Sequence, residues 1–111
     1  MTSLKIVTDK NAPVLNTKAV PVLLPLSTAT KQLLKDMVVI MHQAEGVGLA
    51  APQVGVSERI CVIELDDAVS FYINPEITSR SQEKILFEEG CLSLPGQFFP
   101  IERHERITVK Y

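Results

Sequence analysis

Apolar side chains recur at three- and four-residue spacing between residues 33 and 44, which is the period of one face of a helix. Ser27 and Thr28 precede this stretch, and either hydroxyl can cap a helix by accepting a hydrogen bond from a first-turn N–H. Gly46 follows it and suits a helix end, because a left-handed backbone there carries no Cβ penalty. The pattern predicts one amphipathic helix, whose apolar face is formed by Leu33, Leu34, Met37, Val38, Ile40, Met41 and Ala44.

From residue 59 onwards the pattern becomes that of β-strands. Short runs rich in β-branched and aromatic residues alternate with turn-prone pairs such as Asp66-Asp67 and Arg80-Ser81, and His104-Glu105 is placed near a further turn. One helix followed by a series of strands predicts an α+β fold with antiparallel sheets. The expected strands cover residues 59–65, 71–78, 83–88, 98–101 and 106–111.

Residues 4–25 show no sustained periodicity and contain three prolines, Pro13, Pro21 and Pro25. Proline removes a backbone donor and fixes φ, so it interrupts both helices and central strands. We therefore expect an extended arm with at most a short strand or turn.

Composition narrows the class of protein. A chain of 111 residues with 46% hydrophobic and 22% charged residues fits one globular domain. A net charge of -2 disfavours binding to nucleic acid or to an anionic membrane, and no apolar run approaches the length of a membrane helix. The first nine residues do not have the pattern of a secretory signal. Cys61 and Cys91 could form one disulfide, but nothing else indicates a secreted scaffold, so we expect reduced thiols.

The segment Gly46-Val47-Gly48-Leu49-Ala50-Ala51-Pro52-Gln53-Val54-Gly55 is unusually rich in small residues. Taken alone, it has two interpretations: a helix stop followed by a tightly packed turn, or a backbone that approaches a ligand closely. It is not the phosphate-binding G-x-G-x-x-G fingerprint, because no strand precedes it and the third glycine is missing.

The segment Glu89-Gly90-Cys91-Leu92-Ser93-Leu94-Pro95-Gly96 carries a cysteine between a glycine and a leucine, directly after a predicted strand. Such a cysteine is either a small buried apolar residue or a metal ligand or nucleophile, because a thiolate binds iron or zinc strongly. Cys61 stands inside an apolar run, so we expect it in the core.

Together, the two segments resemble the first two signature motifs of peptide deformylase, the metal hydrolase that removes the formyl group from the N-terminal formylmethionine of nascent polypeptides. Arg103 and the run Ile107-Thr108-Val109 also suit this family. The family's third motif, H-E-x-x-D-H, does not occur in residues 1–111. The resemblance implies one incomplete deformylase domain over residues 1–111, with the N-terminal helix and antiparallel sheets but without the central metal-binding helix.

The resemblance also implies roles for single residues. Cys91 matches a thiolate ligand of the metal, which is Fe²⁺ in many bacterial members, with Zn²⁺, Ni²⁺ or Co²⁺ as substitutes. Gln53, through its side chain, and Leu92, through its backbone N–H, match the donors that stabilise the oxyanion formed from the formyl carbonyl. The positions expected to bind substrate or to steady the site are Gly46, Val47, Gly48, Phe87, Glu89 and Arg103; Glu89 and Arg103 are expected as a charged pair, with a solvated surface pair as the alternative.

The absent motif would supply two histidine ligands and the glutamate that transfers protons. His42 and His104 lack the four-residue spacing that places two imidazoles on one helical face, so we do not expect them to replace it. The implied partner is an N-formylmethionyl peptide, reached at the ribosome through the nascent chain, in the bacterial cytoplasm or an organelle. We expect the chain alone to be inactive and to need the missing segment, a partner or an oligomer to fold. The alternative is a shortened, inactive homologue that binds peptides or self-associates.

Overall fold

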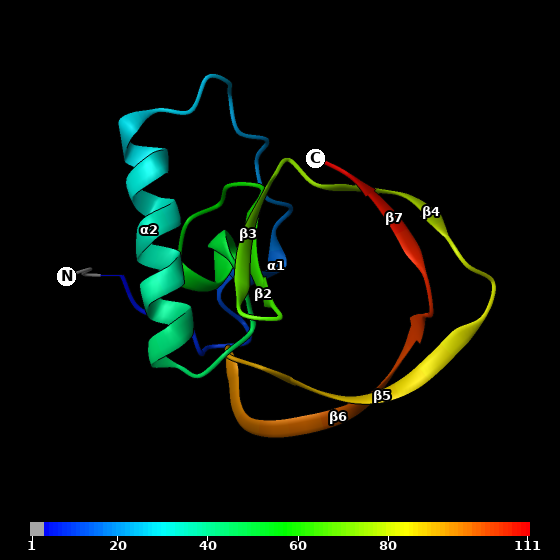
Figure 1. The fold of residues 1–111 in the computed structure, drawn as a ribbon. Helices are drawn as coiled ribbons and strands as arrows, with labels where there is room; N and C mark the ends of the chain where they lie inside the picture. Colours follow the sequence, from blue (N-terminus) through cyan, green and yellow to red (C-terminus); the bar gives the residue numbers. More distant parts are fainter. Residues whose placement is uncertain (1–3) are drawn as a thin grey trace.

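The computed structural model describes residues 4–111, and its mixture of one long helix with antiparallel sheets confirms the predicted α+β class. Figure 1 shows two regions: a body of residues 4–75, and an arch of residues 76–111 that extends away from it. The body contains α1 (Pro13–Asn16), α2 (Thr28–Gln43), β1 (Gly48–Ala50), the 3-10 helix η1 (Ala51–Val54), β2 (Ile60–Leu65) and β3 (Ala68–Ile73). The arch contains β4 (Glu76–Arg80), β5 (Lys84–Cys91), β6 (Leu94–His104) and β7 (Ile107–Lys110).

The helix α2 begins where the sequence predicts it. Ser27 is the N-cap, and its Oγ accepts a hydrogen bond of 3.1 Å from the backbone N–H of Thr30. At the other end, the N–H of Gly46 donates to the carbonyl of Met41 at 2.9 Å, and a second bond closes the preceding turn. This is the pattern of a Schellman end, which satisfies carbonyls that the helix itself leaves unpaired.

The left-handed residue at this helix end is Glu45, with φ of 57°, so the prediction that Gly46 takes this conformation is wrong. Gly46 has a different role at this helix end. A Cβ at this position would lie 2.7 Å from Cδ1 of Leu92, which belongs to the arch. The missing side chain therefore allows the arch to approach the end of α2.

The helix α2 packs on a three-stranded antiparallel sheet with the order β1-β2-β3. Met37, Met41 and Val62 are completely buried between the helix and the sheet. Alternation along β2 explains this, because Ile60 and Val62 face the helix while Cys61 between them is only half-buried. The core consists of Leu33, Met37, Ile40, Met41, Leu49, Ala51, Val54, Ile60 and Val62.

The body departs from the predicted pattern at two places. The segment from Gly46 to Gly55 contains the strand β1 and the 3-10 helix η1, where a packed turn was one of the two interpretations. The strand predicted over residues 71–78 is wrong as one element, because it is interrupted at Asn74 and Pro75. Asn74 has a φ of 53°, and proline cannot donate to a sheet, so the chain leaves β3 here and enters β4.

The N-terminal arm is held to the rest of the body by backbone and side-chain hydrogen bonds and by one isolated β-bridge between Val20 and Glu58. Val7 donates to the carbonyl of Gln53 at 2.7 Å, and the Asn74 side chain bonds both backbone groups of Val22, at 2.7 and 2.9 Å. The arm also contains the single-turn helix α1, which the expectation of an extended arm missed.

Within residues 4–111, no helix is long and apolar enough to cross a membrane.

The arch is a two-stranded antiparallel ribbon with a corner between the pair β4-β7 and the pair β5-β6. In β5 and β6, Lys84 pairs with His104, and in β4 and β7, Arg80 pairs with Ile107. Three residues of one strand therefore oppose two of the other between these pairs. An extra residue on one side of a ribbon bends it and increases its twist, as in a β-bulge. Both β5 and β6 are longer than the predicted strands over residues 83–88 and 98–101.

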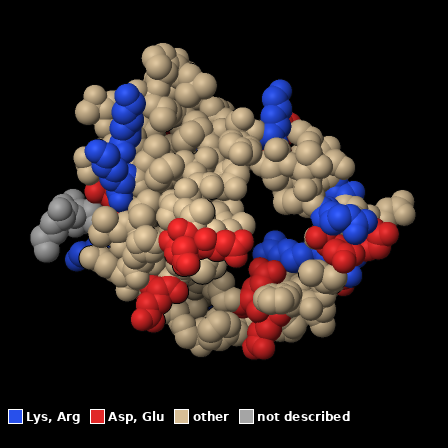
Figure 2. Space-filling model, viewed as in Figure 1, with Lys and Arg blue, Asp and Glu red and all other residues tan. Residues whose placement is uncertain are grey.

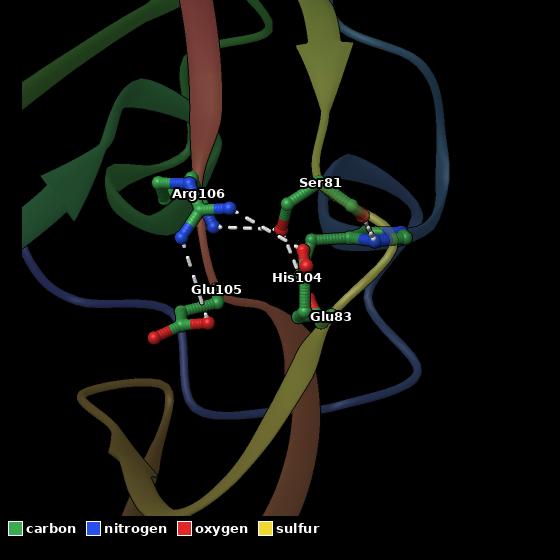
Figure 3. A network of polar contacts seen from close by, with 5 residues as sticks. All are labelled: Ser81, Glu83, His104, Glu105 and Arg106. Carbon is green, nitrogen blue, oxygen red and sulfur yellow. Dashed lines mark hydrogen bonds and ion pairs between the residues drawn. The ribbon is translucent and has the colours of Figure 1, made fainter.

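A polar network occupies this corner (Figure 3). The N–H of Ser81 donates to the carbonyl of Arg106 at 2.8 Å, and the N–H of Arg106 donates to Oγ of Ser81 at 3.0 Å. The ring Nδ1 of His104 lies 2.8 Å from the carbonyl oxygen of Ser81. The Arg106 guanidinium also lies 3.3 Å from a carboxylate oxygen of Glu83 and 3.7 Å from one of Glu105. The bend is therefore closed by its own side chains.

The arch contributes almost nothing to the buried core. Ser93 is the only buried residue among residues 76–111, and Figure 2 shows the molecule hollowed between the body and the arch. The arch meets the body at two points. One is its C-terminal end, where the ring of Tyr111 lies 4.6 Å from the ring of Tyr72, centre to centre. The other is the far end of the β5–β6 hairpin, which we call the arch tip (residues 91–96).

Candidate functional site

A groove of about 700 Å³ lies where the arch tip meets the body. One wall comes from the end of α2 and β1, the opposite wall comes from the arch tip, and the N-terminal arm contributes two side chains. Its lining includes Ile6, Thr8, Gly46, Val47, Gly48, Gln53, Cys91 and Leu92. The groove therefore joins segments that lie far apart in the sequence.

Gln53 stands at the centre of this junction, on η1. Its Oε1 accepts a hydrogen bond of 2.9 Å from the N–H of Ala50, three residues earlier. Its Nε2 lies 3.4 Å from Sγ of Cys91 and 3.3 Å from Oγ of Ser93. Because the carboxamide oxygen is occupied by a backbone donor, the NH₂ end of the side chain faces the arch tip.

Cys91 ends β5, and its side chain is exposed and free. It is positioned by the hairpin turn and by Gly90, where a Cβ would lie 2.8 Å from Cε1 of Phe98 on the neighbouring strand. Cys61 is also a free thiol, so the two cysteines are not joined, as the sequence predicts. Cys61 is half-buried rather than part of the core, and its burial raises the pKa of its thiol.

Leu92 anchors the arch tip to the body. Its side chain is half-buried, meets Gly46 and packs against the apolar core beneath α2. Because Leu92 is held by the body, its chain neighbours Cys91 and Ser93, which both contact Gln53, are held beside the groove.

The structure brings six of the predicted site residues together around the groove: Gly46, Val47, Gly48, Gln53, Cys91 and Leu92. It does not place Phe87, Glu89 or Arg103 among the lining residues. Phe87 lies along β5 with 64% of its surface exposed.

Glu89 and Arg103 form the expected pair across the hairpin. The guanidinium donates from Nε to Oε2 of Glu89 at 2.8 Å, and from its terminal nitrogen to Oε1 at 2.7 Å. These two hydrogen bonds, together with the positive charge of Arg103, hold the pKa of Glu89 below its ordinary value. The pair ties β5 to β6 just before the arch tip.

The site also contains residues that the sequence did not predict, among them Ile6 and Thr8 in the groove lining and Ser93 beside it. Ser93 is 5% exposed and contacts Gln53 directly, although it lies inside the second motif. Its position between Leu92 and Leu94 was the available signal, because a polar residue in an apolar run is often buried with a partner. Ile6 and Thr8 gave no local signal, since their place in the groove depends on the path of the whole arm.

The two histidines lie elsewhere. His42, in the last turn of α2, contacts the carboxylate of Glu64 on β2 through its Nε2, and His104 belongs to the corner network. Among residues 4–111, no three histidine, cysteine or acidic side chains come together in a way that could hold a metal ion. A catalytic zinc site takes three protein ligands. Cys91 alone therefore does not make a metal site from the described residues.

Comparison with known sequences gives a consistent result. The sequence model of the polypeptide deformylase family matches residues 3–111. A peptide deformylase from Halothermothrix orenii is 49% identical over 100 residues, which cover 88% of this chain and 64% of that protein. A second relative, peptide deformylase 2 from Xanthomonas campestris, is 47% identical over 104 residues and is covered over 61% of its length. This chain thus spans a little under two thirds of the length of these curated relatives.

Solved structures agree with the sequences. The crystal structure of peptide deformylase from Thermotoga maritima matches with a TM-score of 0.93 and 40% identity, over 100% of this chain and 74% of that chain. A class I type b peptide deformylase from Acinetobacter baumannii, bound to Met-Ala-Ser, matches with a TM-score of 0.90 and 32% identity over 99% of this chain and 76% of that chain. Both the body and the arch therefore have counterparts in proteins that were crystallised.

Proposed function

Since this chain belongs to the polypeptide deformylase family, a family of metal-dependent hydrolases, we propose that it forms the peptide groove and the carbonyl-binding side of a deformylase site. The substrate is the formylated N-terminal methionine of a nascent polypeptide. The reaction is hydrolysis of the formyl amide, which releases formate.

The observation that carries this proposal is the orientation of Gln53. Its carboxamide oxygen is held by Ala50, and its NH₂ group is directed toward Cys91 at the groove. A neutral amide donor held in this way suits an oxygen that becomes negative during attack on a carbonyl. Each such donor contributes about 3 kcal/mol to stabilisation of the transition state in well-studied hydrolases. The backbone N–H of Leu92 is the second donor in this proposal.

The opposite wall suits an extended peptide. Within residues 4–111, β1 pairs with β2 on one side only, so its outer edge is open beside the groove. A peptide can add to such an edge as a further strand, with its backbone bonded to β1. Val47 is 68% exposed at the same wall and offers an apolar surface to the methionine side chain.

The residues present do not complete the hydrolytic site. Cys91 offers one thiolate, and the iron or the substitute metals implied by the family require further ligands that the described residues do not bring beside it. We therefore propose that the 111-residue chain binds a formylated peptide but does not release formate by itself.

The test is formate release from a formyl-methionyl peptide, measured with the purified chain loaded with Ni²⁺, or with Fe²⁺ in the absence of oxygen. We expect peptide binding by calorimetry without release, and release once a segment that bears H-E-x-x-D-H is added. Gln53→Ala should weaken binding of the formylated peptide, whereas Gln43→Ala, on the exposed end of α2, should not.

Two outcomes would contradict the proposal. If the unaltered chain did not bind the formylated peptide, the groove could not have the proposed role of a peptide-binding site. Metal-dependent turnover by the chain alone would show that it contains ligands outside the groove described above, and variants of His42 and His104 would then be examined first.

A second candidate function, self-association, is favoured by one observation. The arch exposes several large apolar side chains, namely Ile85, Leu86, Phe87, Phe98, Ile107 and Tyr111. Where such side chains form a contiguous patch, the patch marks an interaction site, a ligand-binding groove or an aggregation-prone surface. Sedimentation of the purified chain over a range of concentrations tests this function, which a monomer at all concentrations would exclude.

A further inference from the structure

Ser93 differs from every other residue of the arch. It is 5% exposed, whereas the remaining residues from 76 to 111 are half-buried or exposed. Its hydroxyl faces the body, where Oγ lies 3.3 Å from Nε2 of Gln53. A buried hydroxyl needs a hydrogen-bond partner, and here that partner is the proposed oxyanion donor.

The hydrogen bonds of the Gln53 carboxamide can be assigned one by one. The oxygen accepts from the N–H of Ala50 at 2.9 Å. The nitrogen carries two protons, and its two neighbours are Oγ of Ser93 at 3.3 Å and Sγ of Cys91 at 3.4 Å. A hydroxyl oxygen is a good acceptor, and sulfur is a weak one. Of the two contacts made by the nitrogen, the bond to Ser93 is therefore the stronger, and together with the bond from Ala50 to the oxygen it holds the amide at both ends.

The proton directed at Cys91 has a different role. Cys91 is exposed and lines the groove, while Ser93 is buried beside it. A carbonyl oxygen that enters the groove can replace the weak sulfur contact without disturbing the bond to Ser93. One N–H of Gln53 holds the side chain in place, and the other stays available to a ligand.

We propose that Ser93 is a positioning residue, whose hydroxyl orients the Gln53 carboxamide so that one N–H remains aimed into the groove beside Cys91. The effect on a substrate carbonyl rests on the function proposed above. The orientation itself is a property of the free chain and is measured without any ligand.

The experiment compares the ¹⁵N-labelled chain with three variants by nuclear magnetic resonance. Ser93→Ala removes the hydroxyl, Ser93→Thr retains it, and Ser79→Ala removes an exposed serine elsewhere on the arch as a matched control. The unaltered chain and the variants Ser79→Ala and Ser93→Thr should each show two well-separated proton signals from the Gln53 side-chain amide. In all three proteins, the Gln53 carboxamide should be as ordered as the backbone. In Ser93→Ala the two signals should approach each other and the carboxamide should become mobile.

Binding supplies the second readout. Loss of one hydrogen bond corresponds to a change of roughly five- to tenfold in an equilibrium constant. In Ser93→Ala, the affinity for a formyl-methionyl peptide should fall by about this factor, while the affinity for the same peptide with a free amino terminus stays the same. A role of Ser93 in folding alone would change both affinities together.

The possible results separate the two proposals. An ordered Gln53 carboxamide in Ser93→Ala would overturn the positioning role. A mobile carboxamide with unchanged affinity for the formylated peptide would also overturn it, because the orientation would then have no consequence at the groove. A mobile carboxamide in Ser93→Ala, with no peptide binding even by the unaltered chain, would support the orientation by Ser93 and overturn the proposed function.

Discussion

The body and the arch are built from similar strands but are stabilised differently. In the body, α2 covers a sheet, and nine apolar residues are buried between them. The arch is held together mainly by hydrogen bonds between two strands, and among residues 76–111 only Ser93 is buried. The groove lies between these regions, so Gln53 belongs to the part with a core, and its partners Cys91 and Ser93 belong to the part without one. The precision of the site therefore depends on the contacts of the arch tip.

The largest expected change in stability comes from removing apolar side-chain atoms, and this change should differ between the body and the arch. Met37 is fully buried in the body, so Met37→Ala should lower the free energy of unfolding by about 2–5 kcal/mol. Leu86 is 71% exposed on the arch, so Leu86→Ala should change it by less than about 0.5 kcal/mol. Urea denaturation followed by circular dichroism measures both values. A large loss in Leu86→Ala would mean that the arch has a core of its own in solution.

The second-largest expected change in stability comes from altering the contact between the body and the arch tip. A Cβ at Gly46 would lie 2.7 Å from Leu92, whereas a Cβ at Gly48 would meet nothing closer than a carbonyl oxygen at 3.9 Å. Gly46→Ala should therefore displace the arch tip and cost about 1–3 kcal/mol of stability. Gly48→Ala, in the adjacent strand, is the control, and its cost should be clearly smaller. Equal losses in the two variants would show that Leu92 moves aside freely and does not anchor the tip.

Each region carries one cysteine, and the two thiols should differ in reactivity. Cys91 is exposed, whereas burial raises the pKa of Cys61 above the ordinary value of 9.0. Since the thiolate is the reactive form, alkylation by iodoacetamide near neutral pH should be at least about tenfold slower at Cys61. Mass spectrometry of Cys61→Ala and Cys91→Ala assigns the fast and slow phases. A fast phase that persists in Cys91→Ala would show that the sheet of the body opens readily.

The smallest effect is expected at the exposed pair of Glu89 and Arg103. Because the pKa of Glu89 is lowered in the folded chain, its contribution to stability is present above the ordinary value of 4.5 and is lost as the pH falls through the lowered value. Arg103→Met should return the Glu89 pKa toward 4.5, which a titration by nuclear magnetic resonance detects. Lys84→Met, which removes a looser contact of 3.8 Å with Glu102, should leave that pKa in place. An unchanged Glu89 pKa in Arg103→Met would mean that the pair does not persist in solution.

The same comparison explains what the sequence could predict. The α2 helix followed from a periodic apolar face and a serine cap, which are local features that the packing of the body then satisfied. The Asp66-Asp67 turn was also readable, since both residues adopt positive φ in a two-residue hairpin connection. Strand ends were not readable in the arch, because no buried face there distinguishes an inward residue from an outward one.

The break at Asn74-Pro75 had a local signal that was not used, since this dipeptide marks turns. The conformation of Glu45 had none, because any glycine after a helix suggests the left-handed position, and the approach of Leu92 that claims Gly46 is a long-range event. In the groove, the two motifs named Gln53 and Cys91, but their contact depends on the arch folding back onto the body. The burial of Ser93 follows from the same return of the chain.

Because the arch bends between the pair β4–β7 and the pair β5–β6, a rotation at Ser81 and Arg106 displaces the far end of the β5–β6 hairpin. The eight residues of β5 extend about 26 Å from this corner, at about 3.3 Å per residue. A rotation of about 10° at the corner would therefore carry the tip through about 4–5 Å on this length, more than a hydrogen bond can span. The alignment of the groove thus depends on the angle at the corner as well as on the contacts of the arch tip, and substitutions at Ser81 should change the position of the groups that contact Gln53.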